Sequence, residues 1–230
     1  MTLTVKSSHD RITKSIEQGF MYHHLALARS EKFLRKHDSK RLPMFVLYVD
    51  LVSSTKMSSE LEPEIFNTLI RIFSQEMSYV IEQHDGYVLK FVGDAVLSYF
   101  LPSSKMPDKI ITCAKTMHKI IEHAINPILE KKHYPKLEIK ISMDFGDCSV
   151  VRYGSDKIKS HIDLIGLTLN LAAKMQQITK PGSITIGEYV YEKLNSKNKT
   201  LFNKIKTEPK SWKFHGLKDS NQYFVYASNY

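Results

Sequence analysis

The segment from Met44 to Val52 reads MFVLYVDLV and is apolar except for Asp50. A continuous apolar run of this length predicts a buried β-strand, and it is far shorter than the roughly 20 residues of a membrane-spanning helix. A helix is predicted after it, because apolar side chains recur at three- and four-residue steps from Phe66 to Val80. The Asp-Gly pair at 85–86 stops this pattern. A buried strand followed by an amphipathic helix indicates a mixed α+β fold.

The rest of the chain continues this alternation of strands and helices. Two strands, YVLKFV and AVLSYF, are joined by Gly93-Asp94, a turn whose leading glycine suits a type II′ hairpin. A second amphipathic helix has an apolar stripe from Ile110 to Ile121 and is predicted to end at Pro127. The remaining predicted elements are, in order, a strand from Leu137 to Gly146, an arm from Arg152 to Ser160, a short strand from Ile162 to Ile165 and a helix from Gly166 to Lys180. The order β-α-β-β-α-β predicts a ferredoxin-like sheet with helices packed on it and an extension at the C-terminus.

Residues 9–36 predict one amphipathic helix that precedes this domain. Its apolar stripe consists of Ile12, Ile16, Phe20, Leu27 and Leu34. A short basic stretch ending at Pro43 predicts a linker. We therefore expect a basic amphipathic helical extension and linker over residues 1–42 and the main domain over residues 43–230. The helix either covers the core or presents a surface to a regulatory partner.

Charge and cysteine content limit the environment and the partners. The net charge of +9 is concentrated in residues 1–41, which carry +5, and in residues 193–218, which carry +7. Basic ends suit anionic partners, but the aromatic and arginine clustering of nucleic-acid sites is absent, so we favour a solvated basic surface and expect no nucleic acid. The two cysteines, Cys113 and Cys148, lack a CxxC spacing and predict reduced thiols. Without an apolar signal segment, we expect a cytoplasmic protein.

Asp50 is the most informative polar position, because a carboxylate inside an apolar strand requires a cation or hydrogen-bond donors. Asp94 lies at the tip of the predicted hairpin, where its side chain is free to point outward. If the hairpin pairs beside the first strand, the two carboxylates can share Mg²⁺, which binds one or two carboxylates together with phosphate oxygens. The alternatives are a buried structural aspartate and an ordinary turn aspartate.

Two further groups of polar residues accompany predicted helices. Ser54 and Thr55 follow the first strand and lead into a helix, where backbone N–H groups and hydroxyls can bind phosphate. Ser and Thr are also ordinary N-caps at such positions. Asn170 and Lys174 are four residues apart on a helix, so they either address one ligand or form part of a solvated face.

Three blocks of this sequence together resemble the catalytic domain of the class III adenylate and guanylate cyclases. YVDLVSST resembles the family's first metal-binding strand and phosphate loop, LKFVGDAVLSYF resembles its hairpin, and DLIGLTLNLAAKM resembles its strand-and-helix block. The blocks occur in the family's order, and the resemblance covers about residues 43–228. It implies the nucleotidyl cyclase fold for this chain.

The resemblance also implies roles for individual residues. Asp50 and Asp94, assisted by the backbone carbonyl of Leu51, would bind two divalent ions, Mg²⁺ or Mn²⁺. Lys90 and Asp163 match the pair that reads the base. Because an Asp acceptor complements an exocyclic amine, this pair implies adenine. ATP would therefore be converted to cyclic AMP and pyrophosphate.

Other positions match the residues that hold the ribose and the phosphates. Ser54 and Thr55 belong to the phosphate loop, and Asn170 matches the residue that positions the ribose. Two positions depart from the family pattern: Lys174 stands where Arg is usual, and His215 stands where a triphosphate-binding Lys is usual. Lys keeps the charge but lacks the planar fork of Arg, and a His is mostly neutral at pH 7.

In this family the site forms between two chains, which implies a homodimer with two equivalent sites. The metal-binding carboxylates would come from one chain, and the base-reading residues with Asn170 and Lys174 from its partner. The departures at Lys174 and His215 leave a second hypothesis, a catalytically weak or inactive nucleotide-binding module that signals through its N-terminal helix. The basic ends leave a third, a nucleic-acid binder.

Overall fold

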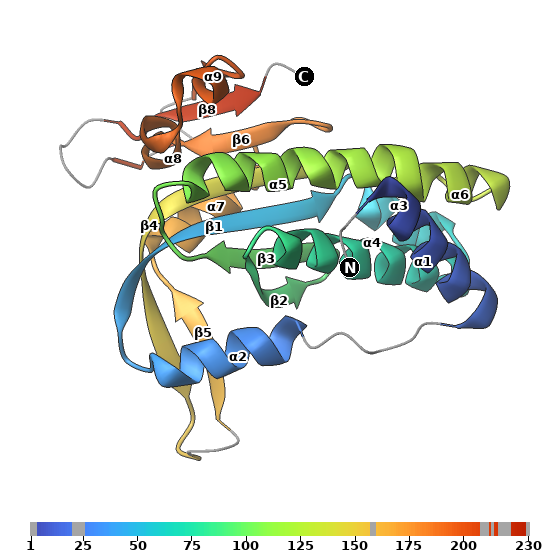
Figure 1. The fold of residues 1–230 in the computed structure, drawn as a ribbon, viewed down its shortest axis with the longest axis horizontal. Coiled ribbons are helices and arrows are strands. Elements are labelled where there is room, and N and C mark those ends of the chain that lie inside the picture. Colours follow the sequence, from blue (N-terminus) through green and yellow to red (C-terminus); the bar gives the residue numbers. More distant parts are fainter. Residues whose placement is uncertain are drawn as a thin grey trace.

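The computed structural model describes residues 4–19, 26–156, 160–207, 212, 214–215 and 222–228. An eight-stranded sheet forms its centre (Figure 1). The strands are β1 (Arg41–Leu51), β2 (Tyr87–Val92), β3 (Ala95–Phe100), β4 (Ile139–Tyr153), β5 (His161–Ile165), β6 (Ile184–Gly187), β7 (Phe202–Lys204) and β8 (Val225–Ser228). Their order across the sheet is β2-β3-β1-β4-β6-β8-β7, and β5 pairs with β4 outside this path.

The predicted buried strand, β1, lies inside the sheet and pairs antiparallel with both β3 and β4. Its side chains alternate between two hydrophobic cores, with Phe45 and Leu47 in one and Met44 and Val46 in the other. Burial on both faces explains why the apolar run in the sequence is continuous. The predicted α+β fold with helices on the sheet and a C-terminal extension is confirmed, the extension consisting of β6, β7 and β8 with two short helices.

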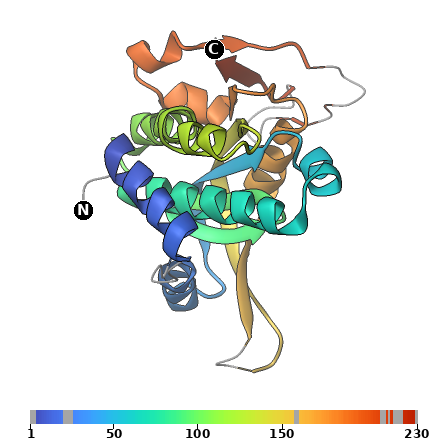
Figure 2. The ribbon, with the colours of Figure 1, turned by 90° about the vertical axis from the view of Figure 1, so that its right-hand side faces the viewer.

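Helices cover both faces of the sheet (Figures 1 and 2). They are α1 (Val5–Gln18), α2 (Ala26–Lys36), α3 (Ser54–Glu60), α4 (Pro63–Gln83), α5 (Met106–Ile120), α6 (Asn126–Lys131), α7 (Leu167–Gln176), α8 (Glu188–Lys193) and α9 (Ser196–Lys199), with a π-helical turn, η1 (Ile121–Ile125), between α5 and α6. Buried side chains of α4 and α5, such as Phe73 and Met117, belong to the first core. Those of α7, such as Leu171 and Met175, belong to the second. Among the described residues, no helix combines the length and apolarity needed to cross a membrane.

The helix predicted to end at Pro127 continues past it. The backbone passes from α5 through η1 into α6, and Pro127 lies in the first turn of α6. A proline is tolerated there because the first-turn N–H groups of a helix have no partner within the helix. The π-helical turn is the local adjustment that joins the two helices.

The N-terminal region is helical, but the prediction of one helix over residues 9–36 is wrong. α1 ends at Gln18, and Gly19 follows with a φ of 89°, a conformation that stops a helix. Ile12 and Leu34 of the predicted stripe are buried, Leu27 is exposed, and Phe20 lies outside the described residues. The two helices lie against different parts of the domain: α1 contacts α4, α5, η1 and α6, whereas α2 contacts β2 and β5. The division between residues 42 and 43 stays a prediction, and β1 begins at Arg41.

Candidate functional site

Asp50 and Asp94 lie next to each other at one end of the sheet. Asp50 is near the end of β1 and pairs with Ala95 of β3, so the preceding Asp94, in the β2–β3 turn, is its neighbour. Gly93 has a φ of 60°, which a glycine adopts without strain and which lets the chain reverse here. Burial and then the charge of Asp94 raise the pKa of the Asp50 carboxyl. The structure therefore brings together the two acids that the sequence singled out.

Lys140 of β4 is a third charged residue at this position, and the sequence did not reveal it. Its Nζ lies 3.2 Å from Oδ2 of Asp50, and this contact lowers the pKa that burial and Asp94 raise. Asp50 and Lys140 are directly paired across β1 and β4, so the contact follows from the strand register. One ammonium group faces two carboxylates, and the acidic pair is not neutralised by it.

These residues fit a hard divalent cation. Two carboxylates that are held close together and partly buried repel each other, and a cation between them relieves this repulsion. Carboxylate oxygens are ligands that suit Mg²⁺ or Mn²⁺. Within the part of the chain that the structure describes, no group of three or more His, Cys, Asp or Glu side chains is placed so that it could hold a metal ion by itself. The protein would therefore supply Asp50, Asp94 and backbone oxygens such as that of Leu51, and water or substrate phosphate would complete the coordination.

Lys90 and Asp163 also meet, although they are 73 positions apart in the chain. Nζ of Lys90, on β2, donates to Oδ2 of Asp163, on β5. Oδ1 of Asp163 accepts a hydrogen bond of 2.8 Å from the backbone N–H of Leu164, which fixes the carboxylate. The side chain of Asp163 is only 12% exposed, so this acid is sheltered and its lysine partner is more accessible.

Two residues beside Asp163 were not found from the sequence. Nε2 of His161 lies 3.8 Å from Oδ2 of Asp163. The two residues are two apart on β5 and therefore face the same side, a pattern that could have indicated them. Tyr48 is near as well, since burial and the charge of Asp163 raise the pKa of its hydroxyl. The side chains of Lys90, His161 and Tyr48 thus lie around the Asp163 carboxylate.

Asn170 and Lys174 project from α7, and both are exposed. The helix is anchored to the sheet, because Ser142 Oγ donates to the carbonyl of Ala172 at 2.7 Å and Gln176 Nε2 donates to the carbonyl of Tyr48 at 3.0 Å. These anchors leave the Asn170–Lys174 side of α7 facing outward. Within the described residues the Lys174 side chain makes no ion pair, so it is available to an anionic ligand.

Gly166 lets α7 begin close against β4. A Cβ at this position would lie 2.9 Å from the carbonyl oxygen of Asp147, and its φ of 154° is one that L side chains rarely adopt. The glycine therefore permits the close approach that places α7.

Ser54 and Thr55 occupy the first turn of α3, directly after the strand that carries Asp50. The preceding Ser53 has a φ of 60° and its side chain makes no capping hydrogen bond. Among the described residues, no hydrogen bond engages the hydroxyls of Ser54 and Thr55. Ser54 is half-buried and Thr55 is exposed, and their role in phosphate binding stays a prediction.

His215 lies apart from these groups in the hydrogen-bond network. It forms an isolated β-bridge with Gln222 and is exposed. Within the described residues it makes no hydrogen bond or ion pair with the Asp50–Asp94 or Lys90–Asp163 residues. Its role in phosphate binding stays a prediction.

Exposed apolar side chains flank the residues described above. Phe91 and Val92 of β2 are 42% and 49% exposed, and Ile165, the last residue of β5, and Leu167, the first of α7, are 45% and 37% exposed. Phe91 and Val92 come directly after Lys90, and Ile165 and Leu167 come two and four positions after Asp163, so apolar surface borders the polar group. Such surface beside a site is typical of an interface.

Known proteins resemble this chain over most of its length. A family model described as the adenylate and guanylate cyclase catalytic domain matches residues 39–227. A Staphylococcus aureus protein named cytidylate cyclase is 28% identical over 190 residues, which cover 80% of this chain and 43% of that protein. A protein of Rhodovulum sp. (strain MB263) named uridylate cyclase is 28% identical over 163 residues, which cover 66% of each. The chain thus spans less than half of the first relative and about two thirds of the second.

A solved structure shares the fold. The guanylyl cyclase Cya2 superimposes with a TM-score of 0.69 and 20% sequence identity, covering 83% of this chain and 93% of that chain.

Proposed function

The chain belongs to the adenylate and guanylate cyclase catalytic domain family, and from this we propose that it converts ATP to cyclic AMP and pyrophosphate with two divalent ions at a homodimer interface. The observation that carries the proposal is the convergence of Asp50 and Asp94 on one another, with Lys140 as their only close ammonium group in the described structure. Such a pair would bind Mg²⁺ or Mn²⁺ against a triphosphate.

Each residue of the acidic end has a specific task in this proposal. When bound, the ions would lower the pKa of the ribose 3′-hydroxyl and neutralise phosphate charge. Asp50 and Asp94 hold them, while Ser54 and Thr55 donate hydrogen bonds to phosphate oxygens. Lys140, displaced from Asp50 by a cation, would contact the triphosphate. The 3′-oxygen bonds to the α-phosphorus, the bond to the bridging oxygen breaks, and pyrophosphate leaves as the hydroxyl proton passes to solvent.

Lys90 and Asp163 would read the base. A donor beside an acceptor complements a base edge that has a ring nitrogen acceptor beside an exocyclic amine, which is the pattern of adenine. Guanine and uracil have a ring N–H donor beside an exocyclic carbonyl acceptor, so they would place donor against donor and acceptor against acceptor. Cytosine presents the same pattern as adenine, and a relative named cytidylate cyclase is 28% identical to this chain. CTP is therefore the second candidate substrate.

A homodimer would complete the site. Asn170 and Lys174 point outward, and exposed apolar residues border the base-reading pair. A two-fold partner could thus present Lys90, Asp163 and the α7 residues to the Asp50–Asp94 end of the first chain. The ribose would contact Asn170, and Lys174 would offset charge that develops at the α-phosphate.

The N-terminal helices would transmit regulation in the cytoplasm, where the two buried free cysteines stay reduced. Arg29 of α2 donates to the carbonyl of Gly86 at 3.2 Å, just before β2, and Arg35 donates to the carbonyl of Ser160 at 2.7 Å, just before β5. α2 therefore joins the two strands that carry Lys90 and Asp163. A partner that moved α2 would alter the spacing of the base-reading pair.

The decisive experiment incubates the purified protein with ATP, CTP, GTP or UTP and with Mg²⁺ or Mn²⁺, and measures the cyclic product. We expect cyclic AMP, and we expect Asp50→Asn to lower its rate by about 10²–10³-fold because charge stabilisation is lost. Asp85→Asn is the matched control, because Asp85 is an exposed turn aspartate whose side chain pairs with Lys109, away from both charged pairs of the candidate site. Nucleotide binding with no cyclic product under either metal would favour the nucleotide-binding module instead.

A further inference from the structure

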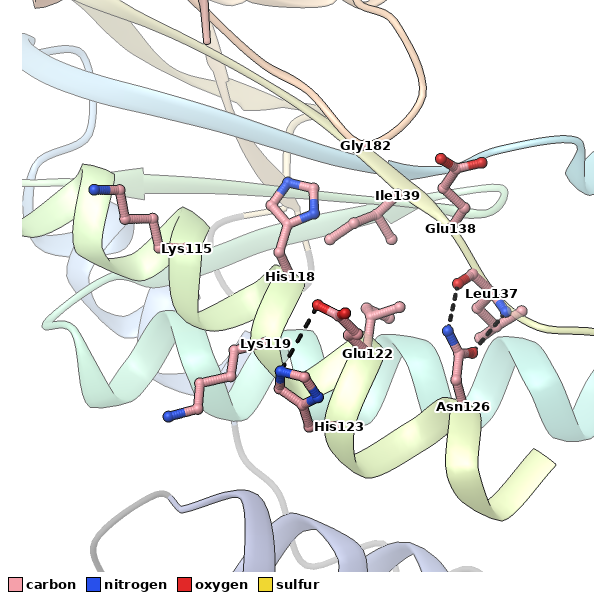
Figure 3. A pocket seen from close by; sticks show the side chains of 11 residues that line it. Lys115, His118, Lys119, Glu122, His123, Asn126, Leu137, Glu138, Ile139 and Gly182 are labelled. Carbon is pink, nitrogen blue, oxygen red and sulfur yellow. Dashed lines mark hydrogen bonds and ion pairs between the residues drawn. The ribbon is translucent and has the colours of Figure 1, made fainter. Parts of the chain in front are cut away.

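A cavity of about 570 Å³ opens between α5, η1 and the start of β4 (Figure 3). It is lined by neither Asp50–Asp94 nor Lys90–Asp163, so it is distinct from the candidate site. Its volume lies in the range of about 300–1,000 Å³ that is usual for small-molecule sites. The floor includes the apolar side chains of Ile121, Leu137 and Ile139.

The walls of this cavity are held by hydrogen bonds. The Asn126 side chain donates to the carbonyl of Leu137 at 3.0 Å and accepts from its N–H at 2.8 Å, which ties α6 to the segment just before β4. The N–H of Gly182 donates to the carbonyl of Ile139 at 2.9 Å. η1 lies between these anchors, and π-helical turns are frequent at functional sites. The cavity is therefore largely preformed.

His118 presents an unpaired polar atom in this cavity. Its Nε2 is buried and has no hydrogen-bond partner within the described structure. An unpaired buried group costs about 1–3 kcal/mol, so a partner for it is expected. Burial also lowers the pKa of His118 although Glu122 opposes this, which keeps the ring neutral at pH 7. A neutral imidazole can donate to or accept from a ligand.

The charged residues around His118 are sorted by sign. Figure 3 shows Lys115 and Lys119 on one side of His118 and Glu122 and Glu138 on the other. Among the described residues the two lysines make no ion pair, and Glu122 has a contact of 3.7 Å with His123. The apolar floor separates the two ends. A ligand that matches this arrangement carries opposite charges at its two ends.

We propose that this cavity binds a small zwitterion with an apolar middle, its carboxylate toward Lys115 and Lys119 and its ammonium toward Glu122 and Glu138. The apolar part would lie on Leu137 and Ile139, and a polar group would meet His118. The inference does not depend on nucleotide turnover. It adds a second ligand site beside the candidate one, since the backbone carbonyl of Glu138 accepts a 2.9 Å hydrogen bond from the backbone N–H of Val52, two residues after Asp50.

Three probes of one length test the proposal: aminocaproate, which has both charges, caproate, which has only the carboxylate, and hexylamine, which has only the ammonium. Each is titrated into the full chain while the histidine ring signals are followed by NMR. We expect aminocaproate to shift the His118 signal, and to bind roughly tenfold more tightly than either singly charged probe. The signal of His133, which is exposed and does not line the cavity, should stay in place.

Variants that remove charge test which end of the cavity binds the carboxylate of the ligand and which end binds its ammonium group. Lys115→Gln with Lys119→Gln should weaken aminocaproate to the affinity of hexylamine, and Glu122→Gln with Glu138→Gln should weaken it to that of caproate. Lys131→Gln with Lys132→Gln is the control, because it removes two exposed charges outside the cavity. The proposal is overturned if aminocaproate does not move the His118 signal at any soluble concentration, or if the three probes bind equally.

Discussion

The two charged pairs of the candidate site differ in sign, and therefore in what they require from a ligand. Asp50 and Asp94 carry like charges, and both burial and Asp94 raise the pKa of Asp50. Lys90 and Asp163 carry opposite charges and bind each other directly. The acidic pair is only partly compensated by Lys140 until a further cation arrives, whereas the Lys90–Asp163 pair is satisfied without a ligand. Cation binding should therefore add stability, and base binding must replace an existing contact.

The largest expected effect is on turnover at the acidic pair. Asp94→Asn removes one of the two carboxylates that would hold the ions, so we expect the cyclisation rate to fall by about 10²–10³-fold. The same change removes the repulsion on Asp50 and should not lower the stability of the metal-free protein. Rates and thermal unfolding of the two proteins are compared side by side. A variant that unfolds at lower temperature would contradict the electrostatic account of this pair.

The base-reading pair should control selectivity more than rate. Asp163→Asn replaces a pure acceptor with an amide that both donates and accepts, so we expect the preference for ATP over GTP to fall by about 10–100-fold, equivalent to roughly 1–3 kcal/mol. The measurement is kcat/KM for each nucleotide. Asp147→Asn is the control, since Asp147 is an exposed acid that pairs with Arg41 at 3.2 Å. Unchanged selectivity in Asp163→Asn would remove Asp163 from base recognition.

Each member of the acidic pair could be singled out from the sequence, but their meeting depended on the condition that the hairpin pairs beside the first strand. Asp50 stands out inside an apolar strand, and the hairpin that follows brings Asp94 to the neighbouring strand. Lys140 was missed because its contact depends on the register between β1 and β4, which composition does not reveal. The contact between Lys90 and Asp163 rested on family resemblance alone, since two strands far apart in the chain must meet.

The predicted helix boundaries are wrong where the sequence pattern and the backbone disagree about where a helix ends. Apolar residues recur across Gly19, so one helix was predicted where α1 ends at Gln18. Pro127 was treated as a stop, but it occupies the first turn of α6, where it is tolerated. The cavity near His118 could not be predicted, because its walls come from η1, β4 and Gly182, which only the tertiary fold brings together.

Replacing Lys174 with Arg should have a smaller effect on turnover, and this effect should be an increase. Lys174→Arg restores the planar fork that binds two phosphate oxygens, so we expect kcat to rise about tenfold, equivalent to roughly 1.4 kcal/mol. Lys180→Arg, another exposed lysine just beyond α7, is the control. The change should leave the preference between ATP and GTP as it was, because it acts at the phosphate end. A lower kcat in Lys174→Arg would show that Lys174 is not a weakened substitute for Arg.

The smallest effect is on the pH dependence of stability without metal. The folded pKa of Asp50 is raised above its ordinary value near 3.8. Between those two values the folded protein keeps a proton that the unfolded chain has lost, so stability is fully present below about 3.8 and falls as the pH rises through the folded pKa. We expect Asp94→Asn to make this fall smaller, because it removes one of the two causes of the raised pKa, and the measurement is Tm against pH in the presence of a chelator.

The comparison isolates Asp50 because other groups titrate alike in both proteins. Burial raises the pKa of Asp144 to about 7, and this acid also makes stability fall as pH rises, but it does so equally with or without Asp94. Burial of Asp50, the larger cause of its raised pKa, remains in Asp94→Asn, so part of the contribution of Asp50 to the slope should persist there and be lost only in Asp50→Asn. Magnesium at neutral pH should restore the lost stability in the wild type and not in Asp50→Asn. If the slopes of wild type and Asp94→Asn coincide, the two acids do not interact, and the like-charged pair is not the feature that attracts the cation.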